Sequence, residues 1–567
     1  MNKYSNAVGA TIKKLFAIDE QVDLSRPSSE LGDYSTNIAL RLAGRLGESP
    51  RNIANKIKDE ILLSGLFDDI SIAGPGFINF RVSAKHLMAE LISQNKNSRP
   101  FGENNSGNNK KCLVEYPSTN MAKPFSVGHL RSANQGWAVR NLMLATGWQV
   151  ITDNHLGDYG APFGIWVVGF KKFSNEDALK KRGIYELGDI YIKTKQAIKD
   201  ELSVGKTNLS DKAQNWLLKL ESGDKEAIEY SERFNKISLD HIHKVMARLG
   251  ISTDYELGEK FFAEKGKKAV LGLLKRGIAK RNEDGSVIVG LDEFNIKVPI
   301  LLLKSNGAAL YATTDLATLI YRQQEFKVDR VIYCVASEQK FYFEQLFALA
   351  KKIGINTELI HMWYGLIDQI NEDGVREKMS SRKGVVLLEE LLDRAEDIAR
   401  KNTKADTITE EDVKKIAVGA IKFSDFSADR RTGMLFDWKR MFNLTGFSGP
   451  YVQYAAVRVN KLLKDNKCDD FDLVKDYDYS SEKSLILKLL DYPSIIKEAA
   501  DRLEPHRVAL FVYELAKELN RYYEHTPIAT SKVSLTEKSA RLGLLYITSN
   551  VFSHALKILG IDIPSKM

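Results

Sequence analysis

The chain has 567 residues, of which 44% are hydrophobic, 28% charged and 9% aromatic. This composition supports large packed cores and excludes a disordered chain, and the length suggests about three or four domains. The 82 basic and 74 acidic residues leave a net charge of +8. A surplus this small does not identify a nucleic-acid-binding protein, but it permits one where positive charge is clustered.

The cysteines and the amino terminus indicate the compartment. Cys112, Cys334 and Cys468 lie far apart and form no CxxC pair, so neither a disulfide framework nor a cysteine-based zinc site is expected. Lys13 and Lys14 interrupt the first apolar stretch, which argues against a signal peptide. The longest apolar run, 298–303, predicts a buried strand and is far shorter than the roughly 18 residues of a membrane helix. We expect a cytoplasmic protein in a reducing compartment, with no membrane segment.

Residues 1–94 predict an N-terminal α+β domain. Ser49 followed by Pro50 is typical of a helix start. Residues 70–72 and 77–80 alternate like strands on either side of a Gly-Pro-Gly turn, which predicts a hairpin. Residues 95–110 are rich in Asn and have no hydrophobic period, so they are interpreted as a linker.

Residues 111–405 predict an α/β domain with a parallel sheet. A strand at 112–116, a helix at about 127–145 and a strand at 148–151 form a β-α-β unit. The pattern returns with a strand at 329–335, a helix at 341–353 and a strand at 359–363. Between the halves, about 170–280 is an inserted helical region, and Asp284-Gly285 is typical of a hairpin turn inside it or at its edge.

After about residue 405 the strands are expected to stop. Thr409-x-x-Asp412 resembles a capping box. Helical periods continue from there to the end, so 406–567 predicts an all-α domain.

The first candidate site is the segment 119–130, TNMAKPFSVGHL. It lies between a parallel strand and the following helix, where open α/β sheets bind ligands. Gly128 allows close backbone approach, His129 stands in the first turn of the helix, whose N–H groups attract phosphate, and Lys123 adds a mobile positive charge. A Gly-His pair alone is common, so the strand-turn-helix setting carries this interpretation.

The second candidate is the segment 377–388, EKMSSRKGVVLL. Its lysines, arginine and serines could fold over a polyphosphate and neutralise developing charge. A solvated basic loop is the simpler alternative for this segment alone. The chain contains no HExxH, GxSxG or Walker-type sequence, which disfavours a zincin, an α/β-hydrolase and a P-loop ATPase.

Together the two segments resemble the HIGH and KMSK signatures of class I aminoacyl-tRNA synthetases. VEYPSTNMAKPFSVGHLR (114–131) and NHLGDYGAPFG (154–164) resemble the arginyl-tRNA synthetase family, as does GPYVQYAAVR (449–458) in its anticodon-binding domain. GDYSTNIALRLA (32–43) and AGPGFINFRVS (73–83) are similar to its N-terminal additional domain. The resemblance covers the whole chain. It implies a Rossmann-like catalytic domain with a helical insertion, an N-terminal α+β domain and a C-terminal anticodon-binding helical bundle.

The resemblance also implies the activity. The family activates L-arginine with ATP and transfers it to tRNA-Arg, without a protein nucleophile, by positioning and charge stabilisation. ATP is expected with Mg²⁺ held mostly by its phosphates, with no zinc bound by the protein. Lys123, His129, Lys378 and Ser380 are the implied catalytic residues. The implied ATP-binding set is Ser126, Val127, Gly128, His129, Lys378, Met379, Ser380, Ser381 and Lys383.

Two positions depart from the family pattern. Ser126 stands where the family usually has histidine, and Ser381 stands where the second signature usually has lysine. Arginyl enzymes often vary that lysine, and a lysine before the first signature is thought to substitute for it; Lys123 fits this role, and Lys383 is a second candidate.

Arginine requires a carboxylate for its guanidinium. Tyr311 and Asp315 are four residues apart, so on a helix both reach one side. In similar enzymes these types, with glutamine and asparagine, surround the substrate, and the implied set is Glu115, Tyr116, Pro117, Ser118, Thr119, Asn120, His129, Tyr311, Asp315 and Gln339. A helix-start acid is the alternative for Asp315.

By the same resemblance, Phe77 and Asn79 would contact the tRNA D-loop, and Tyr451, Gln453, Tyr454 and Arg458 the anticodon stem-loop. A hairpin-core phenylalanine is the rival for Phe77, and at least one of the two tyrosines is expected in the core. A monomer is expected. A class I synthetase for another amino acid and a non-catalytic tRNA-binding paralogue are the alternatives. Tyr311 and Asp315 argue against the first, and Asn120, His129 and Lys378 against the second.

Overall fold

A parallel sheet lies at the centre of the α/β part, where the β-α-β pattern predicts it. The computed structural model describes residues 3–28, 30–96, 99–121, 124–370, 376–378, 387–403, 408–467, 474–528, 530 and 533–567. These residues form two compact units: unit 1 comprises 1–101, 459–492 and 517–551, and unit 2 comprises 102–458, 493–516 and 552–567. The predicted domain boundaries after residues 94, 110 and 405 stay predictions.

In unit 1, a three-stranded antiparallel sheet packs with helices, as predicted. The strands β1 (Tyr34–Thr36), β3 (Phe77–Arg81) and β2 (Asp69–Ala73) lie in that order. The helices are α1 (Lys3–Phe16), α2 (Ile38–Leu46), α3 (Pro50–Leu62), α4 (Ala84–Asn95) and α18 (Lys483–Leu490), with a 3-10 turn at Tyr479–Glu482. The hairpin and the start of α3 are confirmed, because Ser49 Oγ accepts a hydrogen bond from the Asn52 N–H.

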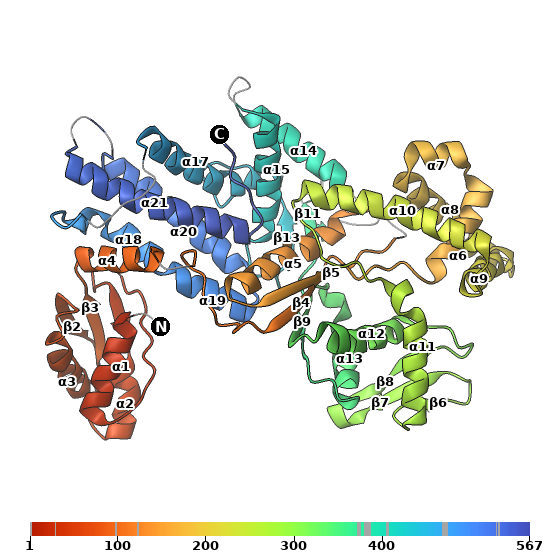
Figure 1. Ribbon diagram of the computed structural model, residues 1–567, viewed down its shortest axis with the longest axis horizontal. Helices are drawn as coiled ribbons and strands as arrows, with labels where there is room; N and C mark the ends of the chain where they lie inside the picture. Colours follow the sequence, from red (N-terminus) through yellow and green to blue (C-terminus); the bar gives the residue numbers. More distant parts are fainter. Residues whose placement is uncertain are drawn as a thin grey trace. The chain divides into compact units, whose positions relative to one another are not determined.

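In unit 2, the order of the parallel strands creates a ligand-binding edge. The sheet runs β10 (Glu358–His361), β9 (Arg330–Tyr333), β4 (Lys111–Glu115) and β5 (Gln149–Asp153), and every neighbouring pair is parallel. Helix α5 (Val127–Ala145) connects β4 to β5, and α13 (Lys340–Lys352) connects β9 to β10 (Figure 1). The chain therefore leaves β4 and β9 in opposite directions, and such a switch point is where open α/β sheets bind ligands.

The predicted helical insertion is present. It comprises α6 (Ala161–Phe173), α7 (Glu176–Arg182), α8 (Ile184–Ser203), α9 (Asn208–Glu221), α10 (Lys225–Arg248) and α11 (Glu259–Lys275). Gly164 allows α6 to pack closely on α9, because a Cβ at this position would lie 1.9 Å from the Ala213 carbonyl oxygen.

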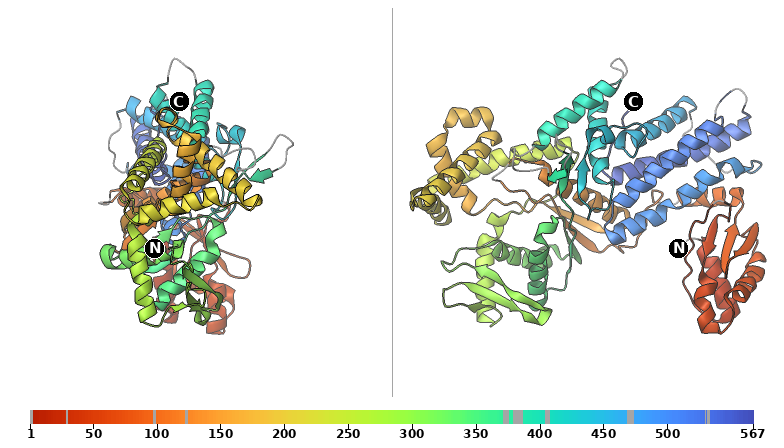
Figure 2. Two further views of the ribbon diagram at one scale, coloured as in Figure 1. Left: turned by 90° about the vertical axis from the view of Figure 1, so that its right-hand side faces the viewer. Right: turned by 180° about the vertical axis from the view of Figure 1, so that it is seen from behind.

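A small antiparallel sheet follows the insertion and was not expected as a separate layer. It consists of β6 (Lys280–Arg281), β7 (Val287–Leu291) and β8 (Ile296–Leu303), and the hairpin turn at Asp284-Gly285 joins β6 to β7. Helices α11, α12 (Tyr311–Tyr321) and α13 cover it (Figure 1, and from behind in Figure 2). The prediction of a fully buried strand at 298–303 is wrong: Val298 is 55% exposed and Leu301 39% exposed, because only one face of β8 packs on the helices.

The prediction that strands stop after 405 is also wrong. Residues Met434–Phe436 form β13, which pairs in parallel with β11 (Ile367–Ile370), and β11 pairs antiparallel with β12 (Arg376–Lys378). Three residues are too few for a periodic signal, so pairing with β11 decides this strand. Helix α15 begins at Glu410 with Thr409 as its cap, as predicted.

The remaining helices are α14 (Leu388–Asn402), α15 (Glu410–Asp425), α16 (Trp438–Met441), α17 (Gly449–Asp465), α19 (Tyr492–Arg502), α20 (His506–His525) and α21 (Leu535–Ile558). Short 3-10 or π turns occur at Asp292–Phe294, Arg322–Phe326 and Ser337–Gln339. Among the described residues, no helix has the length and apolar character needed to span a bilayer.

Candidate active site

The two segments singled out from the sequence meet at the start of α5. Ser126 forms an antiparallel bridge with Leu387, and the Leu388 N–H donates a 3.1 Å hydrogen bond to the Phe125 carbonyl. Lys378 is the last residue of β12. The predicted residues Lys123, Met379, Ser380, Ser381 and Lys383, and the side chain of Lys378, lie outside the described part of the chain.

The first turn of α5 orients His129. The Ser126 N–H donates to His129 Nδ1 at 3.1 Å, and Ser126 Oγ lies 3.2 Å from the same nitrogen. Since Nδ1 accepts, the neutral ring carries its proton on Nε2. Gly128 is exposed at the helix start, whereas Val127 is buried beneath it. Ser126 therefore orients the imidazole ring of His129.

A cavity of about 440 Å³ lies at the carboxyl ends of β4 and β9. Eight of the residues predicted for arginine line it: Glu115, Pro117, Ser118, Asn120, His129, Tyr311, Asp315 and Gln339. Two others do not. Tyr116 is buried with its hydroxyl donating to the Ser252 carbonyl, and Thr119 is buried and is not among the lining residues.

Acidic side chains gather at one end of this cavity. Asp315 accepts a hydrogen bond from the Tyr342 hydroxyl, and His155 Nε2 lies 3.6 Å from its other oxygen. Burial raises the pKa of Asp315 above its ordinary value. Burial, together with the charges of Asp315 and Asp158, raises the pKa of Glu259 to about 8. Tyr342 and His155 therefore offset only part of the ionisation cost of Asp315, and every cause acting on Glu259 raises its pKa.

Glu259 was missed from the sequence. It is the first residue of α11, and an acid in a first helical turn is ordinary. No local pattern distinguishes it, since its proximity to Asp315 arises from the packing of α11 against α12.

Glu115 shares a buried arginine with a second carboxylate. Arg322 Nη2 lies 2.6 Å from Glu115 and 2.8 Å from Asp153, and all three side chains are buried. The Ser118 hydroxyl donates a further 3.2 Å hydrogen bond to Glu115. Arg322 and Ser118 therefore fix the orientation of the Glu115 carboxylate at the cavity wall.

The residues predicted to contact tRNA differ in exposure. In unit 1, Phe77 is 41% exposed but Asn79 only 2%. On α17, Tyr454 and Arg458 are exposed, and the half-buried ring of Tyr451 packs 5.5 Å from Tyr513. Gln453 is fully buried and donates hydrogen bonds to the Lys415 and Asp562 carbonyls. The structure thus does not bring Asn79 and Gln453 to the surface.

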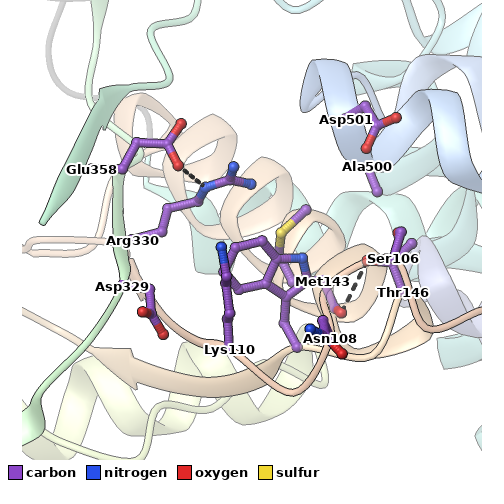
Figure 3. Close-up of a pocket in the computed structure, with 11 residues that line it drawn as sticks. Ser106, Asn108, Lys110, Met143, Thr146, Asp329, Arg330, Glu358, Ala500 and Asp501 are labelled. Atoms are coloured by element: carbon purple, nitrogen blue, oxygen red, sulfur yellow. Dashed lines mark hydrogen bonds and ion pairs between the residues drawn. The ribbon is translucent and has the colours of Figure 1, made fainter.

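A second cavity, of about 450 Å³, lies at the opposite end of the sheet (Figure 3). Trp148 and Arg330 line it, and Arg330 pairs with Glu358 at 2.8 Å. It lies at the amino ends of the strands, away from the predicted site residues, so we take the first cavity as the active-site candidate.

One cluster in the described part of the chain has donor atoms close enough for a metal ion. Its members are Asp429, Glu504 and His506, all in unit 2. Arg431 pairs with both carboxylates, and Arg507 pairs with Glu504 at 2.6 Å. Because arginines already neutralise these acids, the cluster is better explained as an ion-pair network.

Comparison with known families defines the class. Residues 88–438 match the family described as tRNA synthetases class I (R), catalytic domain. Residues 452–567 match the DALR anticodon binding domain, and residues 2–82 the arginyl tRNA synthetase N terminal domain. Fold and site together are those of a class I aminoacyl-tRNA synthetase.

Individual relatives specify the family. The chain is 34% identical to the arginine–tRNA ligase of Lactococcus lactis, over 99% of both chains, and 35% identical to that of Streptococcus thermophilus, over 95% and 94%. The solved Thermus thermophilus arginyl-tRNA synthetase has the same fold, with a TM-score of 0.82 at 22% identity, over 100% of this chain and 99% of that one. The chain belongs to the arginyl-tRNA synthetase family, which confirms the resemblance found in the sequence.

Proposed function

We propose that the cavity binds L-arginine with its guanidinium between Asp315 and Glu259. The observation that carries this proposal is the charge of the described lining: three carboxylates, and no lysine or arginine. Burial raises the pKa of both Asp315 and Glu259, so a bound cation would relieve an ionisation cost that the free protein bears. A planar guanidinium can donate to both acids, whereas a lysine ammonium is a single point charge.

The same cavity suggests where the rest of the substrate lies. Glu115 and Asn120, at the other side, are suited to the α-ammonium group, since Arg322 and Ser118 hold the Glu115 carboxylate in place as an acceptor. Tyr311, Gln339 and Ser118 complete the lining. The substrate carboxylate would then face His129, at the start of α5.

ATP is proposed to bind at the start of α5. The exposed N-terminal turn at Gly128 supplies N–H groups and a favourable dipole for a phosphate. His129 carries its Nε2 proton there as a hydrogen-bond donor. Val127 is buried, so it would support this turn without binding ATP itself. The roles of Lys123, Lys378, Met379, Ser380, Ser381 and Lys383 remain those implied by the family, with Mg²⁺ bound mainly by the ATP phosphates.

The proposed reaction needs no protein nucleophile. The arginine carboxylate attacks the α-phosphorus, the bond to the bridging oxygen breaks and pyrophosphate leaves. A ribose hydroxyl of the terminal adenosine of tRNA-Arg then attacks the carbonyl carbon of the arginyl-adenylate, and AMP leaves. Positioning and charge stabilisation account for the acceleration.

For tRNA, exposure favours Phe77 in unit 1 and Tyr454 and Arg458 on α17 as direct contacts. An exposed aromatic ring can stack on an unpaired base, and arginine can bind phosphate. Tyr451 is half-buried, so it would support Tyr454 and not contact the tRNA directly. We further propose a cytoplasmic monomer.

Amino-acid-dependent ATP–pyrophosphate exchange tests the proposal. The full chain is assayed with each of the twenty amino acids, with and without tRNA-Arg. We expect exchange with arginine and with none of the other amino acids. We also expect this exchange to require tRNA-Arg. Exchange with another amino acid would identify a different class I synthetase, and tRNA binding without exchange would identify a non-catalytic paralogue.

A further inference from the structure

A buried arginine lies two residues after His129 in the same helix. Arg131 is 1% exposed, and its Nε donates a 2.7 Å hydrogen bond to Asp425, which is 2% exposed. Asp425 is the last residue of α15. Asn134 and Gln135, also on α5, donate to the second carboxylate oxygen of Asp425 at 2.9 and 3.1 Å. One carboxylate is thus held by three side chains of α5.

The other end of the same guanidinium contacts the loops that lead into two paired strands. Arg131 Nη1 donates to the Gly365 carbonyl at 2.6 Å and to the Thr432 carbonyl at 2.8 Å. Gly365 precedes β11 and Thr432 precedes β13. The two loops approach so closely that a Cβ on Gly365 would lie 2.8 Å from the Gly433 nitrogen.

This junction connects the start of α5 to the strand that pairs with β12. Helix α5 presents His129, and β11 pairs with β12, whose last residue is Lys378. The guanidinium also lies 5.7 Å from the ring centre of Tyr364, which lines the cavity. Arg131 therefore joins α5, α15, β11 and β13 without being among the cavity-lining residues.

Only arginine satisfies this arrangement. A guanidinium offers several donors in a rigid plane, so one group can bind a carboxylate and two carbonyls in different directions. A lysine could reach one of these acceptors and would leave the others buried without a donor.

We propose that Arg131 is a positioning residue for ATP. By joining α5 to β11 and β13, it holds His129 and the end of β12 at Lys378 at one separation and so sets the geometry for attack on the α-phosphorus. This inference rests on the proposed function. It extends that function to a residue outside the cavity, and it predicts that the ATP end of the site is affected while the arginine end, built on α11 and α12, is not.

The test compares Arg131→Lys with a matched control, Arg541→Lys. Arg541 belongs to unit 1, pairs with buried Glu482 at 3.4 Å and also donates to the Pro527 carbonyl. Both variants thus replace the planar guanidinium group of a buried arginine with an ammonium group. We measure thermal unfolding, the fraction of active sites, exchange kinetics with tRNA, and ATP binding by equilibrium dialysis without arginine.

For Arg131→Lys we expect a fall in kcat per active site of about 10²-fold, because a small misplacement of reacting groups has this effect. The KM for ATP should rise and the KM for arginine stay within twofold of wild type. Arg541→Lys should lower the unfolding temperature and change neither KM. If Arg131→Lys lowers only the unfolding temperature or the fraction of active sites, with unchanged kinetics per active site, the proposal is overturned.

A milder variant covers the case in which Arg131→Lys does not fold. Gln135→Leu removes one donor from Asp425 and leaves the ion pair in place. It should produce a smaller rise in the KM for ATP in the same direction, and an unchanged KM for ATP would overturn the proposal. Dialysis separates failure of the proposed function from failure of the role of Arg131. A wild-type chain that binds ATP but exchanges with no amino acid contradicts the proposed function. Equal ATP affinity of wild type and variants contradicts only the role of Arg131.

Discussion

Glu259 gives the sharpest prediction, because its ionisation couples arginine binding to pH. Its pKa is raised from 4.5 to about 8 by burial and by the neighbouring charges of Asp315 and Asp158. At 1.36 kcal/mol per pH unit, ionising this carboxyl costs about 5 kcal/mol more in the pocket than in water. The free enzyme therefore holds Glu259 mainly protonated below pH 8.

The sign of the pH dependence follows directly. If a guanidinium binds only the ionised form, affinity follows the ionised fraction, which rises from about 0.03 at pH 6.5 to 0.5 at pH 8. Arginine affinity should increase about 15-fold over this range, and binding at pH 7 should release close to one proton. The α-amino group of free arginine loses its proton at a higher pH than this range, so the binding measurements are kept below pH 8.5.

Isothermal calorimetry of arginine binding measures this, in buffers of different ionisation enthalpy to count the protons. Glu259→Gln should weaken binding at pH 8 by about 10- to 100-fold, the loss of one charged hydrogen bond, and should flatten the pH profile. Glu264→Gln is the matched control, since Glu264 lies on the same helix, is 77% exposed and pairs with Lys267 on the protein surface. An unchanged pH profile in Glu259→Gln would refute the argument.

Three further variants test other parts of the site. Asp315→Asn should raise the KM for arginine by about 10²-fold or more and leave ATP binding intact, measured by exchange and dialysis; normal arginine affinity would contradict the assignment. Ser126→Ala should cost less than tenfold in exchange, since the Ser126 N–H still orients His129, whereas His129→Ala should cost about 10²-fold or more. Equal effects of these two changes would argue against that orientation. Gly136→Ala should lower stability by about 1–3 kcal/mol in chemical denaturation, because the new Cβ would lie 2.5 Å from Tyr116 side-chain carbons.

Elements with strong periodic or capping signals were predictable. Helix α5 begins at Val127 and ends at Ala145, and β4 occupies 111–115, both where the sequence places them. The hairpin around Gly74 and the cap at Thr409 also agree, because each depends on residues adjacent in sequence. The short strands β11, β12 and β13 were missed, since their pairing is made between segments far apart in the chain.

By itself, the sequence determined the family and the parallel sheet, and the resemblance of segments such as 119–130 and 309–322 to the family indicated most of the residues that line the proposed arginine cavity. Tertiary structure alone decided which residues face the cavity: Tyr116 and Thr119 are buried outside its lining, while Glu259 and His155 line it. It also decided the charge balance: Arg322 pairs with both Glu115 and Asp153, whereas burial raises the pKa values of Asp315 and Glu259. The physical reason is that burial and the distance between charges depend on how helices and strands pack, and neither quantity is a property of neighbouring residues in the chain.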